Sequence, residues 1–491
     1  MRTRYRVVGL FWALWATLAA ADADWVLRGG TVYSMDDTAS HYSAIAIKGN
    51  RIVWLGDSHA AATRVGPATQ IIELNGRTVL PGFIDTHIHS MDTVPLINGV
   101  KLSPYQSADE VLASIADHAR KHPYQNPLLG SGFLAPAFGV SGPTAAQLDA
   151  VVPDRPALIV DEGGHTGWAN TLALQAAGIS RETPDPVPGA HFFQRDAEGN
   201  PTGWLVEGAA IDPVSEALGV VSEEAIALAA PDFFREMSAV GLTAAFDAGM
   251  IDTGELGRRL ALQMVEAGEF PVRMVASLYV NQPAQLTDAL ATLAELNERY
   301  DHELFTVSTL KLSLDGTVEA KTAVMLDPYL LPEGHEAKPL LPNPVMFDAV
   351  AAAHAVDVDL HLHAIGDGAV RSALDAIEHA KRLHPRSDTR TTICHIEIVN
   401  AADVSRFAEL GAVAQTTPTW FYYDELALRY LGTDRFNQMY PLASILRHGG
   451  KVTLGSDYPV SWIGKDALNP MFNIEMAVTR QQAGSPEVPV Q

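Results

Sequence analysis

Val79-Leu-Pro-Gly-Phe-Ile-Asp-Thr-His-Ile-His89 is the segment from which the architecture of this 491-residue chain can be predicted. It is an apolar run that carries two histidines, His87 and His89, one residue apart. If the run is a β-strand, side chains two residues apart project from the same face, so the two imidazoles lie side by side. Such a pair can hold one metal ion, and a hydrogen-bonded pair beside a turn is the alternative. The residues downstream favour the metal site.

Eight short apolar segments, beginning with this one, alternate along the chain with longer stretches of helical periodicity. Such alternation favours a parallel sheet, and eight strand–helix units close an α/β barrel. The strand candidates are 83–89, 242–247, 272–278, 309–315, 358–363, 391–396, 412–415 and 451–457. Helices are expected between them, among others over 222–240, 367–384 and 400–410. The predicted fold class is α/β, a (β/α)8 TIM barrel over residues 81–480.

Two further regions are set apart from the predicted barrel. Residues 24–80 contain short β-branched segments separated by Gly49-Asn50 and Asn75-Gly76, two hairpin turn signals, and they predict a small β unit. Residues 99–220 do not fit one strand–helix step and hold an extra strand candidate, 157–161. We interpret them as an insertion at the barrel mouth that forms a wall of the pocket. Residues 481–491 are interpreted as a tail.

Residues 1–23 have the layout of a secretory signal peptide. Arg2, Arg4 and Arg6 precede an apolar run over 7–21, which small residues close in an A-x-A cleavage pattern. The run is shorter than the roughly 20 residues of a membrane span, so cleavage is favoured over a permanent anchor. We therefore expect an exported protein, periplasmic or secreted, with no stable membrane anchor after cleavage.

The composition limits the classes of partner. The net charge of −24 argues against nucleic acid or an anionic membrane as a partner, and it leaves a small-molecule substrate in a pocket open. The chain has a single cysteine, Cys394, so no intrachain disulfide can form. An oligomer is compatible with the sequence, which does not specify the oligomeric state.

Side chains that can bind metal stand at or near the ends of several predicted strands. Functional groups gather at the carboxyl ends of barrel strands, so we expect these side chains to meet at one end. They are His87, His89, Lys311, His363, His395 and Asp457. His361 lies two residues before His363 and faces the same way, so it competes for the same role.

The segment around His87 resembles the amidohydrolase superfamily. Five further phrases resemble its branch called amidohydrolase family 3, or YtcJ-like proteins. They are GGHTGWAN from Gly163, KLSLDGTVE from Lys311, HAIGDGA from His363, TICHIE from Thr392 and GSDYPV from Gly455. The resemblance runs from about residue 24 to 480. It is specific for the fold and the metal site and says little about the substrate.

The resemblance implies a hydrolase with one or two divalent metal ions, usually zinc, at the barrel mouth. It implies that His87 and His89 hold the more buried ion and that His363 and His395 hold the other, or contact substrate if only one ion binds. Asp457 is implied to be both a ligand and a proton shuttle. Lys311 is implied to bridge the ions as a carbamate.

The chemistry of these residues agrees with the implied roles. Imidazole and carboxylate suit zinc, a bound metal brings the pKa of water close to neutrality, and a carboxylate can then move a proton to the leaving group. Leu310 and Leu312 flank Lys311, and desolvation favours a neutral amine that can react with carbon dioxide. A plain lysine paired with Asp315 or Asp457 is the alternative.

Three residues are candidates for substrate binding. The resemblance places His165 over the substrate, whereas a loop histidine by itself is more often a surface residue. Trp168 can supply an apolar wall or belong to the core. Glu319 is a candidate contact to substrate or metal.

The predicted function is an exported zinc-dependent hydrolase that cleaves an amide or related non-peptide C–N bond with a metal-activated water. Ester or carbamate cleavage at the same site and a truncated, inactive binding protein are the alternatives. Members of the resembled family continue beyond the Ala477-Val-Thr-Arg480 phrase with strands that complete the small β unit. This chain ends at Gln491, so we expect the N-terminal unit to be an incomplete β-sandwich.

Overall fold

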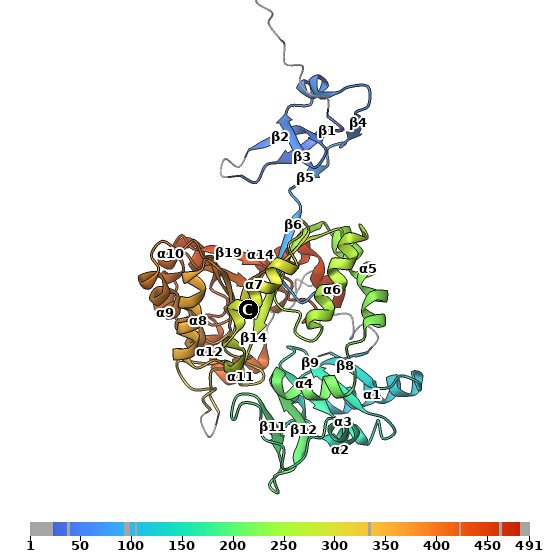
Figure 1. Ribbon diagram of the computed structural model, residues 1–491, viewed down its shortest axis with the longest axis vertical. Helices are drawn as coiled ribbons and strands as arrows, with labels where there is room; N and C mark the ends of the chain where they lie inside the picture. Colours follow the sequence, from blue (N-terminus) through green and yellow to red (C-terminus); the bar gives the residue numbers. More distant parts are fainter. Residues whose placement is uncertain are drawn as a thin grey trace, which may run out of the picture. The chain divides into compact units, whose positions relative to one another are not determined.

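The computed structural model describes residues 23–36, 40–92, 99–103, 106–331, 335–421, 424–460 and 464–481. The chain forms two compact units, Met1–Gly82 and Phe83–Gln491, shown in Figure 1. The predicted signal peptide lies almost entirely outside the described residues and stays a prediction. In the described parts of the chain, no helix combines the length and the apolar character needed to cross a bilayer.

The first unit is a five-stranded sheet in which β1 is paired on both sides. The strands are β1 (Trp25–Tyr33), β2 (His41–Lys48), β3 (Arg51–Gly56), β4 (Gln70–Glu73) and β5 (Thr78–Val79). The turn at Gly49-Asn50 joins the antiparallel strands β2 and β3, as predicted. The hairpin expected at Asn75-Gly76 is wrong, because β4 and β5 both pair in parallel with β1 instead of with each other.

The second unit contains the predicted barrel, an eight-stranded parallel sheet in the order β19-β18-β17-β16-β15-β14-β13-β6. The strands are β6 (Phe83–Ile88), β13 (Leu242–Asp247), β14 (Arg273–Val280), β15 (Phe305–Ser313), β16 (Asp359–Ala364), β17 (Thr391–His395), β18 (Val413–Thr416) and β19 (Lys451–Leu454). Each corresponds to one predicted strand, so the fold class is confirmed. β15 begins four residues earlier than expected, because the chain already pairs with β14 from Phe305 onward.

The barrel closes where the chain leaving β19 meets β6. Thr86 Oγ1 donates a hydrogen bond to the Leu454 carbonyl at 2.8 Å, and the Asp457 amide donates to the His87 carbonyl at 2.7 Å. Gly455 makes this approach feasible, since a Cβ there would lie 2.5 Å from the His87 nitrogen. The closure therefore fixes Asp457 directly beside the histidine pair.

Helices cover the outside of the sheet (Figure 1). They are α5 (Glu223–Ala239), α6 (Gly254–Glu266), α7 (Ala289–Arg299), α8 (Asn343–Ala355), α9 (Asp367–Leu383), α10 (Arg406–Leu410), α11 (Glu425–Leu431), α12 (Thr433–Phe436), α13 (Leu442–Arg447) and α14 (Pro470–Thr479). The helix expected over 400–410 is divided, because the Asn400 side chain caps a short 3-10 turn and the α-helix begins only at Arg406.

The segment between β6 and β13 forms a sheet of its own in the order β11-β12-β10-β9-β8-β7. Its strands are β7 (Val100–Lys101), β8 (Leu128–Phe133), β9 (Ala157–Asp161), β10 (Thr166–Ala169), β11 (Phe192–Arg195) and β12 (Pro201–Val206). Its helices are α1 (Ala108–Lys121), α2 (Ala145–Asp149), α3 (Thr171–Ala176) and α4 (Gly208–Ala217). The extra strand predicted at 157–161 is therefore present, and apolar residues on both sides of this sheet form separate cores.

Candidate active site

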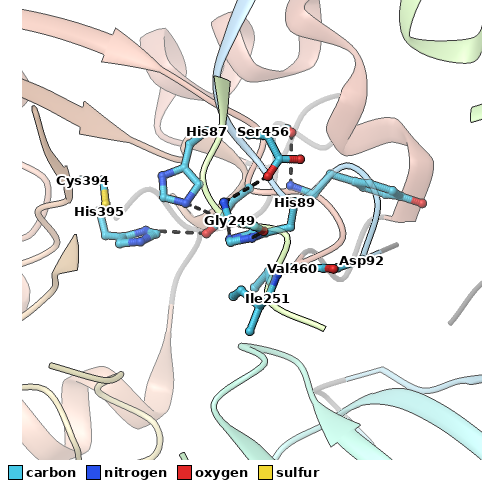
Figure 2. Close-up of polar contacts among 12 residues, drawn as sticks. His87, His89, Asp92, Gly249, Ile251, Cys394, His395, Ser456 and Val460 are labelled. Atoms are coloured by element: carbon cyan, nitrogen blue, oxygen red, sulfur yellow. Dashed lines mark hydrogen bonds and ion pairs between the residues drawn. The ribbon is translucent and has the colours of Figure 1, made fainter. Parts of the chain in front are cut away.

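Three histidines surround the carboxylate of Asp457 at the carboxyl end of the barrel strands. Figure 2 shows these histidines, His87, His89 and His395, gathered together. Asp457 Oδ1 lies 3.4 Å from His87 Nε2 and 3.5 Å from His89 Nε2, and its Oδ2 lies 3.6 Å from His395 Nδ1. Asp457 and His395 both have positive φ, 50° and 72°, so each is presented from a sharp bend, His395 at the last residue of β17 and Asp457 three residues after β19. Sequence positions 370 residues apart thus converge on one point, as predicted.

His363 lies beside this group on β16, the neighbour of β17 in the sheet. Its ring centroid is 4.3 Å from that of His395 and 5.2 Å from that of His165. His361 takes a different place, because its Nε2 lies 3.1 Å from His87 Nδ1 and its ring stacks on Phe246. Of the two competing histidines, His363 lines the cavity and His361 does not.

Lys311 is buried beneath the histidines, with 1% of its surface exposed. Its Nζ lies 3.5 Å from His87 Nε2 and 3.1 Å from the thiol sulfur of Cys394. Neither Asp315 nor Asp457 forms an ion pair with it in the described part of the chain. The alternative of a lysine paired with one of these carboxylates is therefore not what the geometry shows.

Cys394 is a contact that the sequence patterns did not predict. Potential ligand atoms of His87, Cys394 and His395 lie within 4.8 Å of one another, as do those of His87, His89 and Asp457. Burial raises the pKa of the Cys394 thiol to about 11, so it is protonated at neutral pH. The second group, with two imidazoles and a carboxylate, is the better match to the ligands that zinc prefers.

Residues behind the candidate ligands fix their orientation. Gln415, fully buried on β18, places its Oε1 3.2 Å from His87 Nδ1, and the Gly249 carbonyl lies 2.8 Å from His89 Nδ1. The Asp247 carboxylate accepts from the amides of Ser90 and Gly249 at 3.0 Å each. These partners leave Nε2 of both histidines directed at Asp457, and Asp247 fixes the backbone at Ser90 and Gly249 beside His89.

Burial keeps the candidate imidazoles neutral. It lowers the pKa of His87, His363 and His395 well below 6.5, with nearby Lys311 adding to the effect, and it lowers the pKa of His89 to about 4. A neutral imidazole has the free lone pair that a metal requires. Burial also raises the pKa of Asp457 to about 7, because its desolvation outweighs the charges of Lys311 and His165, which act to lower the value.

This set of donors fits a divalent cation. His395 Nδ1 and Asp457 Oδ1 are buried and make no hydrogen bond within the described residues, although burying such atoms without a partner is costly. A cation bound among His87, His89 and Asp457 would satisfy the carboxylate oxygen and the imidazole lone pairs together. The chemistry of the donors therefore agrees with a resident metal.

A cavity of about 160 Å³ is lined by His89, Lys311, His363, His395 and Asp457, and His87 is not among its lining residues. Its walls come from the barrel loops and from the insertion, which contributes Val160, His165, Glu207 and Ile211 among others. Trp420 also lines it, and its indole stacks on the His395 ring at 5.3 Å with the two planes 8° apart. The interpretation of the insertion as a pocket wall agrees with these lining residues.

His165 reaches into this cavity as one half of a buried pair. Its Nδ1 lies 2.6 Å from the Glu207 carboxylate, and Glu207 is 1% exposed. Burial lowers the pKa of His165, but the Glu207 and Asp161 charges outweigh it and raise the value to about 9. His165 is therefore a cation at neutral pH, and Glu207 is a site residue that sequence reasoning missed.

Two predicted substrate contacts do not reach the cavity. Trp168 is fully buried in the insertion core, where its indole nitrogen donates to the Thr144 carbonyl at 2.8 Å and its ring packs on Phe138. Glu319 is absent from the cavity lining, and burial together with Glu397 and Asp424 raises its pKa well above 4.5. Trp168 was an ambiguous prediction because an aromatic beside a loop is typical of both core and pocket.

Fold and donor set together define a metal-dependent hydrolase, and comparisons with known proteins identify its family. The sequence profile described as the Amidohydrolase family matches residues 70–489. This chain therefore belongs to the Amidohydrolase family, which confirms the resemblance seen in its motifs.

Individual relatives extend over nearly the whole chain. The exoenzymes regulatory protein AepA of Pectobacterium carotovorum is 31% identical over 442 residues, 88% of this chain and 94% of that protein. The N-substituted formamide deformylase of Arthrobacter pascens is 27% identical over 484 residues, 95% of this chain and 85% of that protein. The structure of an uncharacterized metal-dependent hydrolase from Pyrococcus horikoshii has a TM-score of 0.71 and 20% identity, covering 95% of this chain and 87% of that one, and supports the fold.

Proposed function

We propose that this protein is a zinc-dependent amidohydrolase that cleaves an amide or related non-peptide C–N bond in a small molecule. The observation that carries the proposal is the convergence of His87, His89 and Asp457, because His89 and Asp457 of this group also line a cavity. The family supports hydrolysis of this kind in general, and the name of the Arthrobacter relative, an N-substituted formamide deformylase, points to N-formyl amides as the first compounds to test.

The chain's own residues divide the work of such a reaction. His87, His89 and Asp457 would hold the metal, with His395 and His363 beside them for a second ion or for the substrate. A bound zinc ion would supply Lewis acidity and a water molecule with a pKa near neutrality. Asp457 would accept a proton from that water and return it to the leaving nitrogen, since its carboxylate faces both the ligands and the cavity.

His165 would bind the substrate carbonyl oxygen. Its Nδ1 is committed to Glu207, so as an imidazolium it has its second N–H available for the oxygen on which negative charge develops. Trp420 would provide an apolar wall beside His395. These two residues explain how a flat amide group could be held over the candidate ligands.

Lys311 would act as a carbamate that contributes to the ligand set. Its amine is buried, and its near neighbours, the Cys394 thiol and His87, carry no negative charge at neutral pH. Addition of the unprotonated amine to carbon dioxide would form an N–C bond and release one proton to solvent, leaving an anionic carbamate beside the candidate ligands. Recovery of activity in chelator-treated protein should then need bicarbonate as well as zinc. Equal recovery in carbonate-free buffer would contradict the carbamate.

The main test is a substrate panel with matched variants. N-formyl amides, N-acyl amides, cyclic amides, esters and carbamates are assayed with the zinc-loaded protein, and Asp457→Asn is compared with Asp388→Asn, an exposed aspartate outside the site. We expect C–N substrates to be cleaved and kcat to fall by about 10³-fold or more in Asp457→Asn only. Turnover confined to esters would favour the alternative reaction, and full activity after metal removal would refute the proposal.

We further propose that the protein is exported. The basic start, the apolar run over 7–21 and the small residues after it support cleavage near residue 23. Amino-terminal sequencing of protein from the periplasmic or extracellular fraction should find a new terminus there. A full-length protein retained in the cytoplasmic fraction would contradict this proposal.

A further inference from the structure

A second cavity, of about 570 Å³, lies between the insertion sheet and the barrel loops. Phe192 of β11 and Trp204 of β12 line it, as do residues 320–322, 335–338 and 340, together with Arg429 and Tyr430 near the end of α11. It shares no lining residue with the active-site cavity. A volume in this range is typical of a pocket for an organic molecule.

Three cations line this cavity without a carboxylate partner. The charged groups of Lys321, Lys338 and Arg429 take part in no ion pair or side-chain hydrogen bond within the described residues. Glu336 is the single carboxylate in the lining and is exposed at the rim, and His335 is engaged with the Lys321 carbonyl at 2.8 Å. The chain has a net charge of −24, whereas the charged side chains that line this cavity are mostly positive.

Lys321 is the most constrained of these cations. It has a left-handed φ of 60°, and its amide donates to the Val318 carbonyl at 3.0 Å, so the backbone holds it in a tight turn. Its side chain is half-buried, and burial alone lowers its pKa. A partly desolvated ammonium without a counter-charge is unfavourable, and an anion in the cavity would relieve that cost.

The remaining wall is aromatic. Trp204 and Tyr430 are more than nine-tenths buried and Phe192 is half-buried. The cavity therefore combines apolar aromatic surface with positive charge.

We propose that this cavity binds a small organic anion, a carboxylate attached to an aromatic body, with Lys321, Lys338 and Arg429 around the carboxylate and Trp204 and Tyr430 against the ring. The assignment is independent of the proposed hydrolysis, because it uses none of the residues of the active site. Lys321 is half-buried, whereas Lys338 and Arg429 are exposed, so partial desolvation at this site comes from Lys321 and the aromatic wall. Three cations around one carboxylate would strengthen its binding.

Calorimetric titration of the zinc-loaded protein with 2-naphthoate tests this site. The neutral alcohol 2-naphthalenemethanol, of similar size, is the matched ligand control. We expect one bound naphthoate per chain and at least about tenfold weaker binding of the alcohol, since each factor of ten corresponds to one strong polar contact. Equal affinities for the two compounds would overturn the proposal, because the cations would then contribute nothing.

Charge-reversal variants locate the bound probe. Lys338→Glu/Arg429→Glu should weaken naphthoate binding by about tenfold or more, whereas Lys451→Glu/Arg386→Glu, with the same charge change at two exposed positions elsewhere, should leave it unchanged. Lys321→Ala is a second variant, in case the double reversal lowers the melting temperature. Binding that survives in both cavity variants, or that disappears on chelation of the metal, would place the probe in the active-site cavity and refute the assignment.

Discussion

Glu207 shows how a single buried carboxylate can set the charge of a residue in the cavity. It has a positive φ of 67°, accepts from His165 at 2.6 Å and offers its own amide to the His165 carbonyl at 2.7 Å. The two contacts bind the ends of β10 and β12 together at the cavity edge. The backbone strain at Glu207 agrees with a position under functional constraint.

The His165–Glu207 pair predicts a pH dependence of stability. The folded pKa of His165 is about 9, above its ordinary value of 6.5, so the folded state binds more protons between these values and stability must fall as pH rises through them. The pair should contribute up to about 3 kcal/mol near pH 6 and lose it by pH 10, given roughly 1.4 kcal/mol per pKa unit.

This contribution can be measured by comparing the melting temperatures of chelator-treated wild-type and Glu207→Gln protein between about pH 5 and pH 10. The difference in melting temperature should be largest at about pH 5 to 6.5 and shrink toward pH 9 to 10. Glu198→Gln, an exposed glutamate of the insertion, is the control and should show no such trend. A difference that grows with pH would show that the pair does not have the stated charge state.

A second prediction for a single residue concerns Gln415, which we expect to orient the candidate ligand His87. Its Oε1 is 3.2 Å from His87 Nδ1, and its side-chain amide donates to the Thr416 carbonyl at 3.0 Å, so it is itself fixed. Gln415→Ala should weaken zinc affinity by about 10–100-fold, the usual effect of losing a partner that orients a ligand. Competition with a chromophoric chelator measures this, and Gln438→Ala, an exposed glutamine, should retain wild-type affinity. Unchanged zinc binding in Gln415→Ala would exclude the orienting role.

At the scale of elements, the contact between β6 and the chain after β19 is where the barrel closes. No regular ladder joins these strands, and individual hydrogen bonds from Thr86, His89 and Asp457 replace it. The closure depends on the close approach of Gly455 to His87. Because the closing segment carries Asp457, its position and the geometry of the ligands depend on each other.

Gly455→Ala should therefore impair metal binding. The added Cβ would lie 2.5 Å from the His87 nitrogen and 2.8 Å from its Cβ, so the segment must move away from β6. We expect zinc content and activity to fall by at least about tenfold, since metal sites tolerate only small displacements. Gly449→Ala is the control: its Cβ meets nothing within 4 Å, and only its positive φ of 83° adds strain. Normal zinc content in Gly455→Ala would show that the closure is more adaptable than the geometry indicates.

For the whole molecule, the buried and unpaired donors predict that metal stabilises the folded chain. A ligand that binds only the folded state adds about 4 kcal/mol at a thousand times its Kd, and each kcal/mol raises the melting temperature by roughly 1 °C in a protein of this size, because the entropy of unfolding grows with chain length. Chelation should lower the melting temperature by several degrees, and zinc should restore it. The same treatment of His89→Ala/Asp457→Asn should have little effect. A wild-type protein indifferent to chelator would argue against a resident metal.

The architecture was predictable because its signals are local. Eight apolar segments separated by helical stretches specify a parallel barrel whatever their exact ends, and ligand-type residues at strand ends then meet at one rim. The hairpin expected at Asn75-Gly76 failed for the same reason, because a turn signal shows that the chain bends and does not show which strand it pairs with. Pairing is a property of the assembled sheet.

The sequence by itself determined the barrel, its family and the set of side chains that converge, because periodicity and motif spacing are written in consecutive residues. The two-residue period of a strand cannot separate His361 from His363, although the phrase that follows His363 favoured it, and only the tertiary structure placed His363 at the cavity and His361 against His87. It also revealed Glu207, Gln415 and the cationic second cavity, which arise where segments distant in sequence pack together. Contacts of that kind depend on three-dimensional proximity, for which a linear pattern has no signal.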